Sequence, residues 1–334
     1  MRGVLLTAHG GYECLDVRAD LAVPTAGRGE VLVRVGAAAV NNTDINTRVG
    51  WYEGGGWTGG FSFPRIQGID ACGTIVAVGD GVAADRVGLR VLVEPCWRDP
   101  GAPMATARFF GSEVDGSFAE FTVVPDRHAH AVRSDFSDAE LATFPCSYST
   151  AENMLCRSSL HAGERVLVTG ASGGVGSAAV QLAVARGARV TAVAGDDKRA
   201  AVVALGAHEV VDRHADLVAS FGAGAFDVVI DVVGGPTWPS LLEVLCPGGR
   251  CAVAGAIAGP LVSLDLRALY LADLRLIGCT VLDGGVFAGL VARIERGEVR
   301  PLVAATFGLD DIVAAQELFL TKGHVGKIVL EVAR

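Results

Sequence analysis

A glycine-rich turn in the middle of the chain offers backbone groups that can bind phosphate. Residues 170–176 read Gly-Ala-Ser-Gly-Gly-Val-Gly, after the apolar run 165–169 and before an Ala-rich stretch. Gly173 leaves room for a pyrophosphate beside the backbone, and Gly176 allows a helix to pack tightly on the preceding strand. The helix N-terminus adds free N–H groups and partial positive charge. Although Ala171 replaces the first glycine of the pattern, the segment predicts a dinucleotide-binding turn with contacts from Ser172, Gly173, Gly174, Val175 and Gly176.

The end of the next expected strand bears on which dinucleotide fits. An acidic residue there usually binds the ribose 2′-hydroxyl of NAD, whereas this strand ends in Ala194 and Gly195. These small residues leave space for the 2′-phosphate of NADPH, which Lys198, Arg199 or Arg213 can neutralise. Asp196 and Asp197 would repel that phosphate if they faced it. The segment therefore favours NADPH and leaves NAD open.

The elements around this turn indicate an α/β fold with two domains. Apolar segments at 165–169, 189–194, 208–211, 226–231 and 250–254 alternate with helical stretches, which predicts a parallel sheet covered on both faces, with an edge strand at 274–278. The first 125 residues instead show short strands between glycine turns, such as 31–35, 73–79 and 118–125. Helices at 286–296 and 310–320 and a strand at 327–330 end the chain, and we expect them to return to the first domain.

Composition excludes several classes of function. The chain of 334 residues has a formal net charge of −9, which argues against a basic surface for nucleic acid or anionic lipid. No run of about 18 apolar residues and no export signal is present, so we expect neither a membrane span nor secretion. The eight cysteines are scattered without a Cys-x-x-Cys pair, which is typical of reduced thiols in the cytoplasm.

Four separated motifs resemble the medium-chain dehydrogenase/reductase superfamily, specifically its zinc-free quinone oxidoreductase and enoyl reductase branches. They are Asn-Asn-Thr-Asp at 41–44, Gly-Ile-Asp-Ala-Cys-Gly-Thr-Ile at 68–75, Gly-Ser-Phe-Ala-Glu-Phe at 116–121 and the turn at 171–176. The resemblance implies a β-rich GroES-like catalytic domain from both chain ends (1–128 and 270–334) and a doubly wound Rossmann domain (129–269), with the active site in the cleft. It also implies cofactor contacts from Asn41, Thr150, Val233 and Ala254, and homodimers formed through the Rossmann edge strands at 274–280.

The zinc-dependent alcohol dehydrogenases of the same superfamily are the main alternative, and their metal ligands can be checked. A catalytic zinc site there needs two thiolates and an imidazole. By the resemblance these would fall at Asn41, Ile69 and Cys146, and only Cys146 has the required type. The structural zinc needs four close cysteines between about 94 and 112, where Cys96 stands alone. The sequence therefore predicts no metal.

Without zinc, side chains must polarise the acceptor and supply a proton. The resemblance to the zinc-free relatives implies that Asn41 lies beside the nicotinamide, where it could polarise a carbonyl by hydrogen bonding. By the resemblance to enoyl reductases, Tyr52 is a proton donor after hydride addition, because a positioned phenol can act as a general acid. Asp44 is expected to order the loop, and Cys146 to line the pocket. The glycine-rich segment 54–60 is a candidate lid, and it and 97–110 are expected to shape the substrate site.

The leading hypothesis is hydride transfer from NADPH to a small-molecule quinone, enone or enoyl thioester. The first alternative is reduction of carbonyls to alcohols without zinc. A second is an NADPH-binding protein with little turnover. The acceptor itself depends on loops whose course the sequence does not define.

Overall fold

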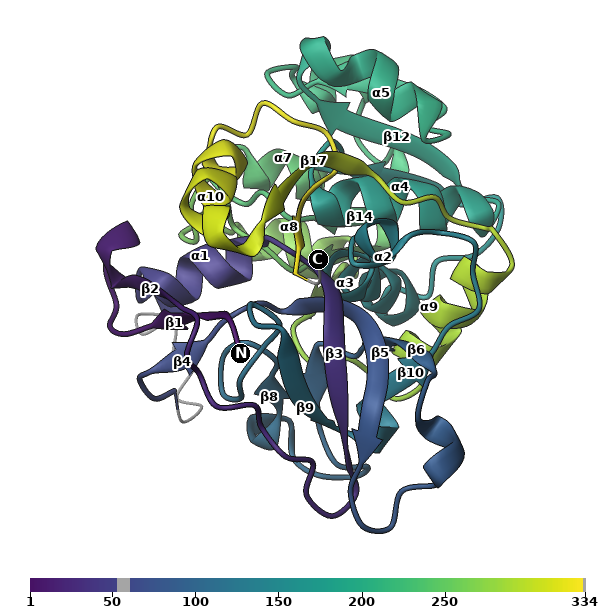
Figure 1. Ribbon diagram of the computed structural model, residues 1–334. Coiled ribbons are helices and arrows are strands. Elements are labelled where there is room, and N and C mark those ends of the chain that lie inside the picture. Colours follow the sequence, from purple (N-terminus) through teal and green to yellow (C-terminus); the bar gives the residue numbers. More distant parts are fainter. Residues whose placement is uncertain (53–60, 333–334) are drawn as a thin grey trace. The chain divides into compact units, whose positions relative to one another are not determined.

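The computed structural model describes residues 1–52 and 61–332 and shows two compact units. Unit 1 comprises residues 1–146, 287–296 and 300–334, and unit 2 comprises residues 147–286 and 297–299. Figure 1 labels the elements of both units along the chain. The candidate lid at 54–60 lies outside the described residues. The α/β class that the sequence predicted is confirmed.

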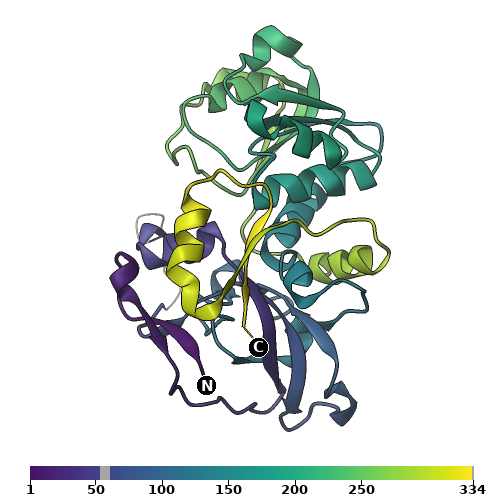
Figure 2. The ribbon, with the colours of Figure 1, turned by 45° about the horizontal axis from the view of Figure 1, so that its top comes forward.

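Unit 1 is built on a seven-stranded sheet that joins the beginning and the end of the chain. Its order is β10-β6-β5-β3-β18-β17, with β9 also paired to β3. The strands are β3 (Glu30–Ala39), β5 (Asp70–Val78), β6 (Arg90–Val93), β9 (Phe121–Pro125), β10 (Ala129–Ala131), β17 (Val303–Gly308) and β18 (Lys327–Glu331). Val329 of β18 lies opposite Ala39 of β3 in an antiparallel pair. In both ribbon views the yellow C-terminal strand runs beside the purple strand β3 (Figures 1 and 2). The expected return of the C-terminal segment to the first domain is confirmed.

Shorter elements complete unit 1. They are β1 (Gly3–Leu6), η1 (Tyr12–Cys14), β2 (Leu15–Arg18), α1 (Asn42–Arg48), β4 (Arg65–Ile66), η3 (Ala84–Arg86), β7 (Cys96–Trp97), η4 (Met104–Thr106), β8 (Arg108–Phe109), η5 (Asp126–His128), α2 (Asp138–Leu141), α9 (Val286–Glu295), η7 (Leu309–Asp311) and α10 (Ile312–Leu320). The sequence pattern missed β17, which pairs in parallel with β18. Alternate residues of β3, namely Val31, Val33 and Val35, are fully buried, as expected for a strand with a packed face.

Unit 2 contains a six-stranded sheet in which every strand is parallel to its neighbours. The order is β13-β12-β11-β14-β15-β16. The strands are β11 (Arg165–Val168), β12 (Arg189–Ala194), β13 (Glu209–Asp212), β14 (Phe226–Asp231), β15 (Leu245–Val253) and β16 (Arg275–Gly278). The helical elements are α3 (Pro145–Arg157), α4 (Gly174–Ala185), η6 (Asp196–Lys198), α5 (Arg199–Ala204), α6 (Leu217–Phe221), α7 (Trp238–Glu243) and α8 (Leu266–Leu271). Parallel strands end at the same edge, so the loops after β11, β12 and β14 lie together.

The boundaries between the units differ from those expected from the sequence. Unit 1 continues to residue 146 because β10 pairs with β6 and so belongs to the first sheet. Unit 2 continues to residue 286 because β16 pairs in parallel with β15. The expected boundaries at 128/129 and 269/270 are therefore replaced by 146/147 and 286/287.

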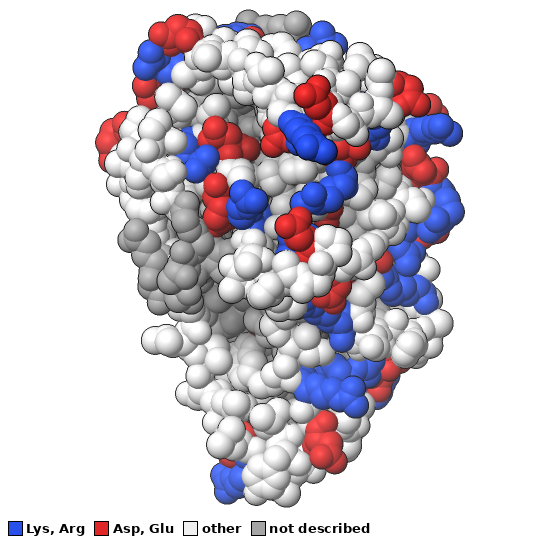
Figure 3. Space-filling view, turned by 90° about the horizontal axis from the view of Figure 1, so that it is seen from below, with Lys and Arg blue, Asp and Glu red and all other residues white. Residues whose placement is uncertain are grey.

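Two surface properties bear on the expected partners. Within the described residues, no helix is long and apolar enough to cross a membrane. On the face shown in Figure 3, Lys and Arg side chains lie among Asp and Glu side chains, and this face shows no continuous basic surface.

Candidate active site

The glycine turn of unit 2 has the local geometry of a phosphate cradle. A Cβ atom at Gly176 would lie 2.2 Å from the carbonyl oxygen of Gly170, so only glycine allows α4 to approach β11 this closely. A Cβ atom at Gly173 would meet nothing nearer than 3.5 Å, so the space beside Gly173 is open. Gly173 is also the N-cap of α4, whose 12 residues give a substantial helix dipole. The turn therefore fits the pyrophosphate of a dinucleotide.

At the end of β12, one cation and one anion lie beside Gly195, where a side chain at that position would point. A Cβ atom there would lie 3.1 Å from a terminal guanidinium nitrogen of Arg213 and 2.5 Å from a carboxylate oxygen of Asp197. Arg213 directly follows β13, and its N–H donates to the Ala194 carbonyl at 3.0 Å. The Arg213 guanidinium therefore lies where a phosphate next to Gly195 would need a counter-charge.

Arg199, predicted from the sequence as another phosphate partner, has its guanidinium engaged. It donates to the carbonyl oxygen of Val210 and to a carboxylate oxygen of Asp196, the latter at 2.8 Å. These bonds tie the start of α5 to β13 and to η6. Lys198 is half-buried one residue earlier. Of the two arginines, Arg213 is the one whose guanidinium borders Gly195.

Asp231 organises the loops that carry two further predicted contacts. This fully buried carboxylate accepts the Thr169 hydroxyl at 2.6 Å and the Val233 N–H at 3.0 Å. Its backbone carbonyl accepts the N–H of Ala254 at 3.1 Å. Val233 and Ala254 thus follow β14 and β15 at the edge that also holds the glycine turn. Thr150 lies on α3, and the roles of Ser172, Thr150, Val233 and Ala254 stay predictions.

In unit 1, Asn41 belongs to a buried network with Asp70 and Lys327. The Lys327 ammonium forms an ion pair with Asp70 at 2.9 Å, and the two side chains are 4% and 0% exposed. The same ammonium donates to the side-chain oxygen of Asn41. The Asn41 amide donates to Asp70 at 2.7 Å and to the Ala39 carbonyl at 3.1 Å. A buried ion pair persists only with such supporting hydrogen bonds.

This network changes the role open to Asn41. Both amide hydrogens point to protein acceptors, so a carbonyl can accept from Asn41 only after one of these bonds breaks. The prediction that Asn41 polarises the acceptor stays untested, and the geometry favours a different role. Asn41 shapes the site as a fixed side chain between Asp70 and Lys327.

A second set of groups connects this network to Tyr52. The backbone N–H of Cys146 donates to Asp70 at 2.6 Å. Asn46 donates to the Tyr52 phenol oxygen at 3.4 Å, and the Thr43 side chain is close enough to lower the pKa of both the Tyr52 phenol and the Cys146 thiol. Burial raises the pKa of Tyr52 above its ordinary value and raises that of Cys146 strongly. Both groups therefore keep their protons at neutral pH.

Asp44 caps the helix that carries Thr43. Its carboxylate accepts the backbone N–H of Asn41 at 2.8 Å, and its backbone carbonyl accepts the Gln67 side chain at 2.9 Å. Burial raises the pKa of Asp44 to about 7, and the nearby charge of Asp70 adds to this effect. The bond to Asn41 holds the start of α1 in place, in agreement with the ordering role predicted from the sequence.

Two of the sequence motifs form the support under Asp70. The Ser117 hydroxyl donates to the backbone carbonyl of Asp70 at 2.5 Å, and the Ser117 N–H donates to the Gly68 carbonyl at 3.0 Å. Gly116 must be glycine, because a Cβ atom there would lie 2.3 Å from the Gly68 carbonyl oxygen. The motifs at 68–75 and 116–121 therefore pack backbone against backbone and fix the start of β5.

The residues that would bind zinc in the metal-dependent relatives do not offer a ligand set. Ile69 is buried and has no donor atom, and Asn41 is held by Asp70 and Lys327. Within residues 1–52 and 61–332, no group of three or more His, Cys, Asp and Glu side chains could hold a metal ion. Zinc independence stays a prediction that rests on these side chains.

Sequence reasoning missed three residues of this site. Asp70 was seen only as part of a motif, and Thr43 only as a neighbour of Asn41. Lys327 was placed in a closing strand without a role. A charged residue inside an apolar strand, as in Lys327 before Ile-Val-Leu, is a signal that could have shown a buried partner.

Comparison with known proteins places both units in one superfamily. The family model described as "Alcohol dehydrogenase GroES-like domain" matches residues 27–134, and that described as "Zinc-binding dehydrogenase" matches 174–296, a segment without Asn41, Ile69 and Cys146. An acryloyl-coenzyme A reductase of Metallosphaera sedula is 32% identical, covering 99% of each chain. A quinone oxidoreductase of Lama guanicoe is 31% identical, covering 99% of this chain and 97% of that protein.

Solved structures show the same fold over the whole length. A provisionally named alcohol dehydrogenase of Sinorhizobium meliloti 1021 is 47% identical with a TM-score of 0.94, covering 99% of this chain and 96% of that one. The crotonyl-CoA carboxylase/reductase AntE, solved in complex with NADP, is 26% identical with a TM-score of 0.87, covering 99% and 95%. The chain therefore belongs to the medium-chain dehydrogenase/reductase superfamily, whose members are oxidoreductases that use nicotinamide cofactors.

Proposed function

We propose that this protein is a zinc-independent, NADPH-dependent reductase of a quinone, enone or enoyl-type acceptor. The observation that carries the proposal is the connected set of Asn41, Asp70, Cys146, Thr43 and Tyr52, in which a protonated phenol belongs to a site without a metal ligand set. The names of the acryloyl-coenzyme A reductase and quinone oxidoreductase relatives support this class of acceptor.

The proposed mechanism divides the chemistry between cofactor and protein. A nicotinamide cofactor held by the glycine turn at Gly173 would supply the hydride for the electrophilic carbon of the acceptor. Tyr52 donates a proton to the reduced acceptor, because its raised pKa keeps the phenol protonated at neutral pH. The Thr43 side chain, which lies near the phenol, helps to orient it, and the phenolate regains its proton from solvent. Asp70 and Lys327 hold Asn41 in a single orientation, so the site does not reorganise when an acceptor binds.

The preference for NADPH rests on Gly195 and Arg213. Gly195 has no side chain of its own to block a 2′-phosphate, and the adjacent Arg213 guanidinium can pair with that phosphate as a planar donor. Asp197 lies on the same side and is exposed, so the phosphate would move it toward solvent. The NADP complex of the AntE structure agrees with this choice. The turn at Gly173 and the helix dipole of α4 bind the pyrophosphate.

The test is an NADPH-oxidation screen of purified protein with quinones, enones, enoyl thioesters, ketones and aldehydes. We expect turnover with activated double bonds or quinones and none above buffer with simple ketones and aldehydes. Turnover of ketones alone would assign carbonyl reduction instead. Tight binding of NADPH with no oxidation by any acceptor would assign a binding protein. One tightly bound zinc per chain in a metal assay would contradict the zinc-independent mechanism.

Tyr52→Phe tests the proton donor within the same screen. Loss of a positioned general acid lowers the rate about 10²–10⁴-fold, so we expect kcat with enones to fall in that range while the Kd for NADPH is unchanged. Phe keeps the ring that packs edge-on against Trp51, which makes it a suitable isostere. Turnover equal to that of the unchanged protein would remove Tyr52 from the mechanism.

We also propose a homodimer formed by pairing the two β16 strands. β16 is an edge of the unit 2 sheet, and large apolar side chains near it are exposed. Leu261, Leu266, Tyr270 and Leu271 are 91%, 64%, 62% and 73% exposed. An open sheet edge beside such a patch is the usual place for a second copy of the same chain. The cytoplasm is the proposed location, supported by eight cysteines of which none forms a disulfide within the described residues.

A further inference from the structure

A hollow lies at the amino-terminal edge of the unit 2 sheet, the edge opposite the glycine turn. Its volume is about 250 Å³, and it is lined by Ser159, His161, Glu164, Gly248, Arg250 and Arg275. Arg275 begins β16, and the other lining residues come from β15 and from the loop before β11. The proposed reductase chemistry does not use this edge.

Two arginines stand side by side at the hollow. Arg250 of β15 and Arg275 of β16 are register partners in a parallel pair, so their side chains leave the same face of the sheet. Like charges on adjacent strands repel at this distance, which destabilises the pair unless an anion compensates. The two arginines differ in how far protein groups neutralise their charges.

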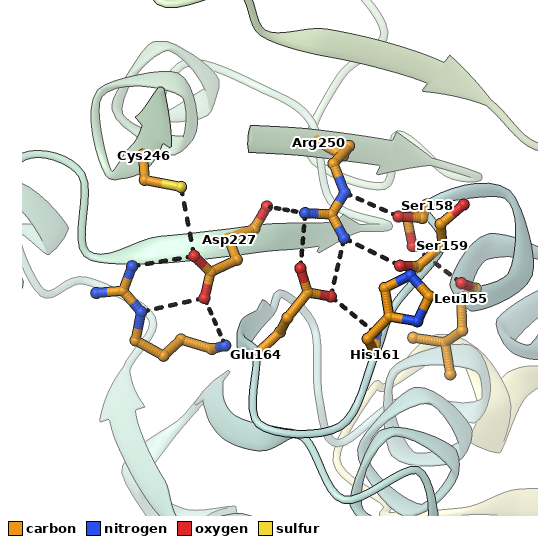
Figure 4. Close-up of polar contacts among 9 residues, drawn as sticks. Leu155, Ser158, Ser159, His161, Glu164, Asp227, Cys246 and Arg250 are labelled. Atoms are coloured by element: carbon orange, nitrogen blue, oxygen red, sulfur yellow. Dashed lines mark hydrogen bonds and ion pairs between the residues drawn. The ribbon is translucent and has the colours of Figure 1, made fainter. Parts of the chain in front are cut away.

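Only Arg250 is neutralised. Its guanidinium donates to both carboxylate oxygens of Glu164 at 2.9 Å, and to the carbonyls of Ser158 and Ser159 at 2.8 and 3.1 Å (Figure 4). The Glu164 carboxylate also accepts the backbone N–H of His161 at 2.8 Å, so its acceptor capacity is largely used. The Arg250 guanidinium is therefore held in place beside the hollow and has little hydrogen-bonding capacity left for a ligand.

The remaining polar groups at the hollow have no protein partner. Within the described part of the chain, the Arg275 guanidinium, the His161 ring and the Ser159 hydroxyl take part in no hydrogen bond or ion pair. The nearby acid Asp227 is engaged by Arg165 at 3.1 Å and by the Cys246 thiol at 3.4 Å (Figure 4). Asp273, two residues before Arg275, forms no ion pair with it. The hollow thus carries one uncompensated positive charge and two further donors.

We propose that this hollow binds a small tetrahedral oxyanion of the phosphate type. A phosphate offers enough oxygens for the planar guanidinium of Arg275, the His161 ring and the Ser159 hydroxyl at the same time. The volume is below the roughly 300–1,000 Å³ of sites for larger organic ligands, so an anion with few other atoms fits best. The anion would supply the counter-charge that Arg275 lacks among the described residues. This site is distinct from the cofactor phosphates, which the opposite edge would bind.

Titration calorimetry with inorganic phosphate tests the site. The protein is first saturated with NADP⁺, so that the glycine turn cannot take up phosphate. We expect one phosphate per chain, and Arg275→Ala should weaken binding about tenfold or more, as expected for loss of a charge-assisted bond. Arg189→Ala is the matched control: Arg189 is also exposed, has no side-chain partner among the described residues and begins a strand, but it does not line this hollow. We expect the control to bind phosphate within twofold of the unchanged protein.

Competition experiments with sulfate and malonate distinguish a site for a tetrahedral anion from a nonspecific attraction of anions. Sulfate should compete with phosphate, and malonate should compete at least tenfold more weakly. Equal binding by Arg275→Ala and the unchanged protein would overturn the proposal, as would equal weakening in the Arg189→Ala control. If the protein binds no nucleotide, the same titration is done without NADP⁺. The phosphate affinities of the two variants and the unchanged protein can still be compared with one another. Failure of the cofactor proposal and failure of this one are therefore distinguishable.

Discussion

Asn41 is a neutral side chain that two neighbouring charged residues hold in one orientation. Lys327 fixes the oxygen of its amide, while Asp70 and Ala39 accept from its nitrogen. In a metal-dependent relative the same position would carry a ligand, and the ion would impose the geometry. Here the ion pair of Asp70 and Lys327 imposes it. The sequence predicted the position of Asn41 in the site, but the two partners come from strands 29 and 286 residues away.

Arg213→Ala should shift the cofactor preference. Hydrogen bonds to charged groups contribute about 1.5–3 kcal/mol, so the KM for NADPH should rise roughly 10- to 150-fold while that for NADH changes little. Steady-state kinetics with both cofactors measures this. Arg199→Ala is the comparison, because its guanidinium is already bonded to Val210 and Asp196. A larger loss of NADPH preference in Arg199→Ala than in Arg213→Ala would contradict the assignment.

The raised pKa of Asp44 predicts that the free energy of unfolding depends on pH. Its folded-state pKa of about 7 is above the unfolded value of roughly 4. The folded protein therefore binds this proton more tightly, and the stabilisation present below pH 4 is lost as the pH rises through 7. Between pH 4.5 and 7.5 the unfolding free energy should fall about 2–4 kcal/mol more in the unchanged protein than in Asp44→Asn, which keeps the acceptor for Asn41.

Urea denaturation of both proteins at the two pH values measures that difference. Comparing the two proteins cancels contributions from other carboxylates such as Glu94, whose pKa is lowered by two adjacent histidines. Parallel pH curves would show that Asp44 stays ionised in the folded state throughout this range.

At the scale of elements, the turn between β11 and α4 contains one glycine needed for packing and another that faces open space, within seven residues. Gly176 is required because the helix backbone meets the turn, whereas Gly173 faces open space. The sequence pattern predicted the packing role of Gly176 correctly, since it depends on local backbone geometry, and the binding role of Gly173 stays a prediction. It could not distinguish Arg199 from Arg213, because that choice depends on how η6 and β13 lie next to each other.

Two alanine substitutions should therefore have opposite effects. Gly176→Ala should lower the unfolding free energy by about 1–3 kcal/mol, since its Cβ atom would meet the Gly170 carbonyl 2.2 Å away. Gly173→Ala should leave stability within about 0.5 kcal/mol, because its φ of −80° suits alanine, but should weaken cofactor binding. Thermal unfolding and fluorescence titration with NADPH measure the two effects. Unchanged NADPH affinity in Gly173→Ala would place the phosphates elsewhere.

For the whole molecule, the elements of both sheets were largely predictable, while the division between the units was not. Periodicity located the parallel strands because each is a short apolar run between glycine turns. The boundaries between the units differ from the expected ones because β10 pairs with β6 and β16 pairs with β15. The composition of a strand does not specify its pairing partner. β17 was missed for the same reason, since its residues are half exposed and paired only with β18.

The exposed patch beside β16 predicts the oligomeric state. Leu271→Glu should convert a dimer to a monomer, because a charge would be buried at the interface. Sedimentation velocity at micromolar concentration measures this. Val203→Glu serves as control, since Val203 is 51% exposed on α5, which packs against β13 at the opposite edge of the sheet. A monomeric unchanged protein, or a dimer that survives Leu271→Glu, would contradict pairing through this surface.

The pairing of β18 with β3 also sets an order for biosynthesis. During translation, β3, Asn41 and Asp70 leave the ribosome long before residues 327–331, which complete their sheet and neutralise the carboxylate. The nascent first unit therefore has an open strand and an unpaired acid for nearly the whole of synthesis, which at about 5–20 residues per second lasts many seconds. The second unit, continuous over residues 147–286, can fold while the first still waits for its last strand.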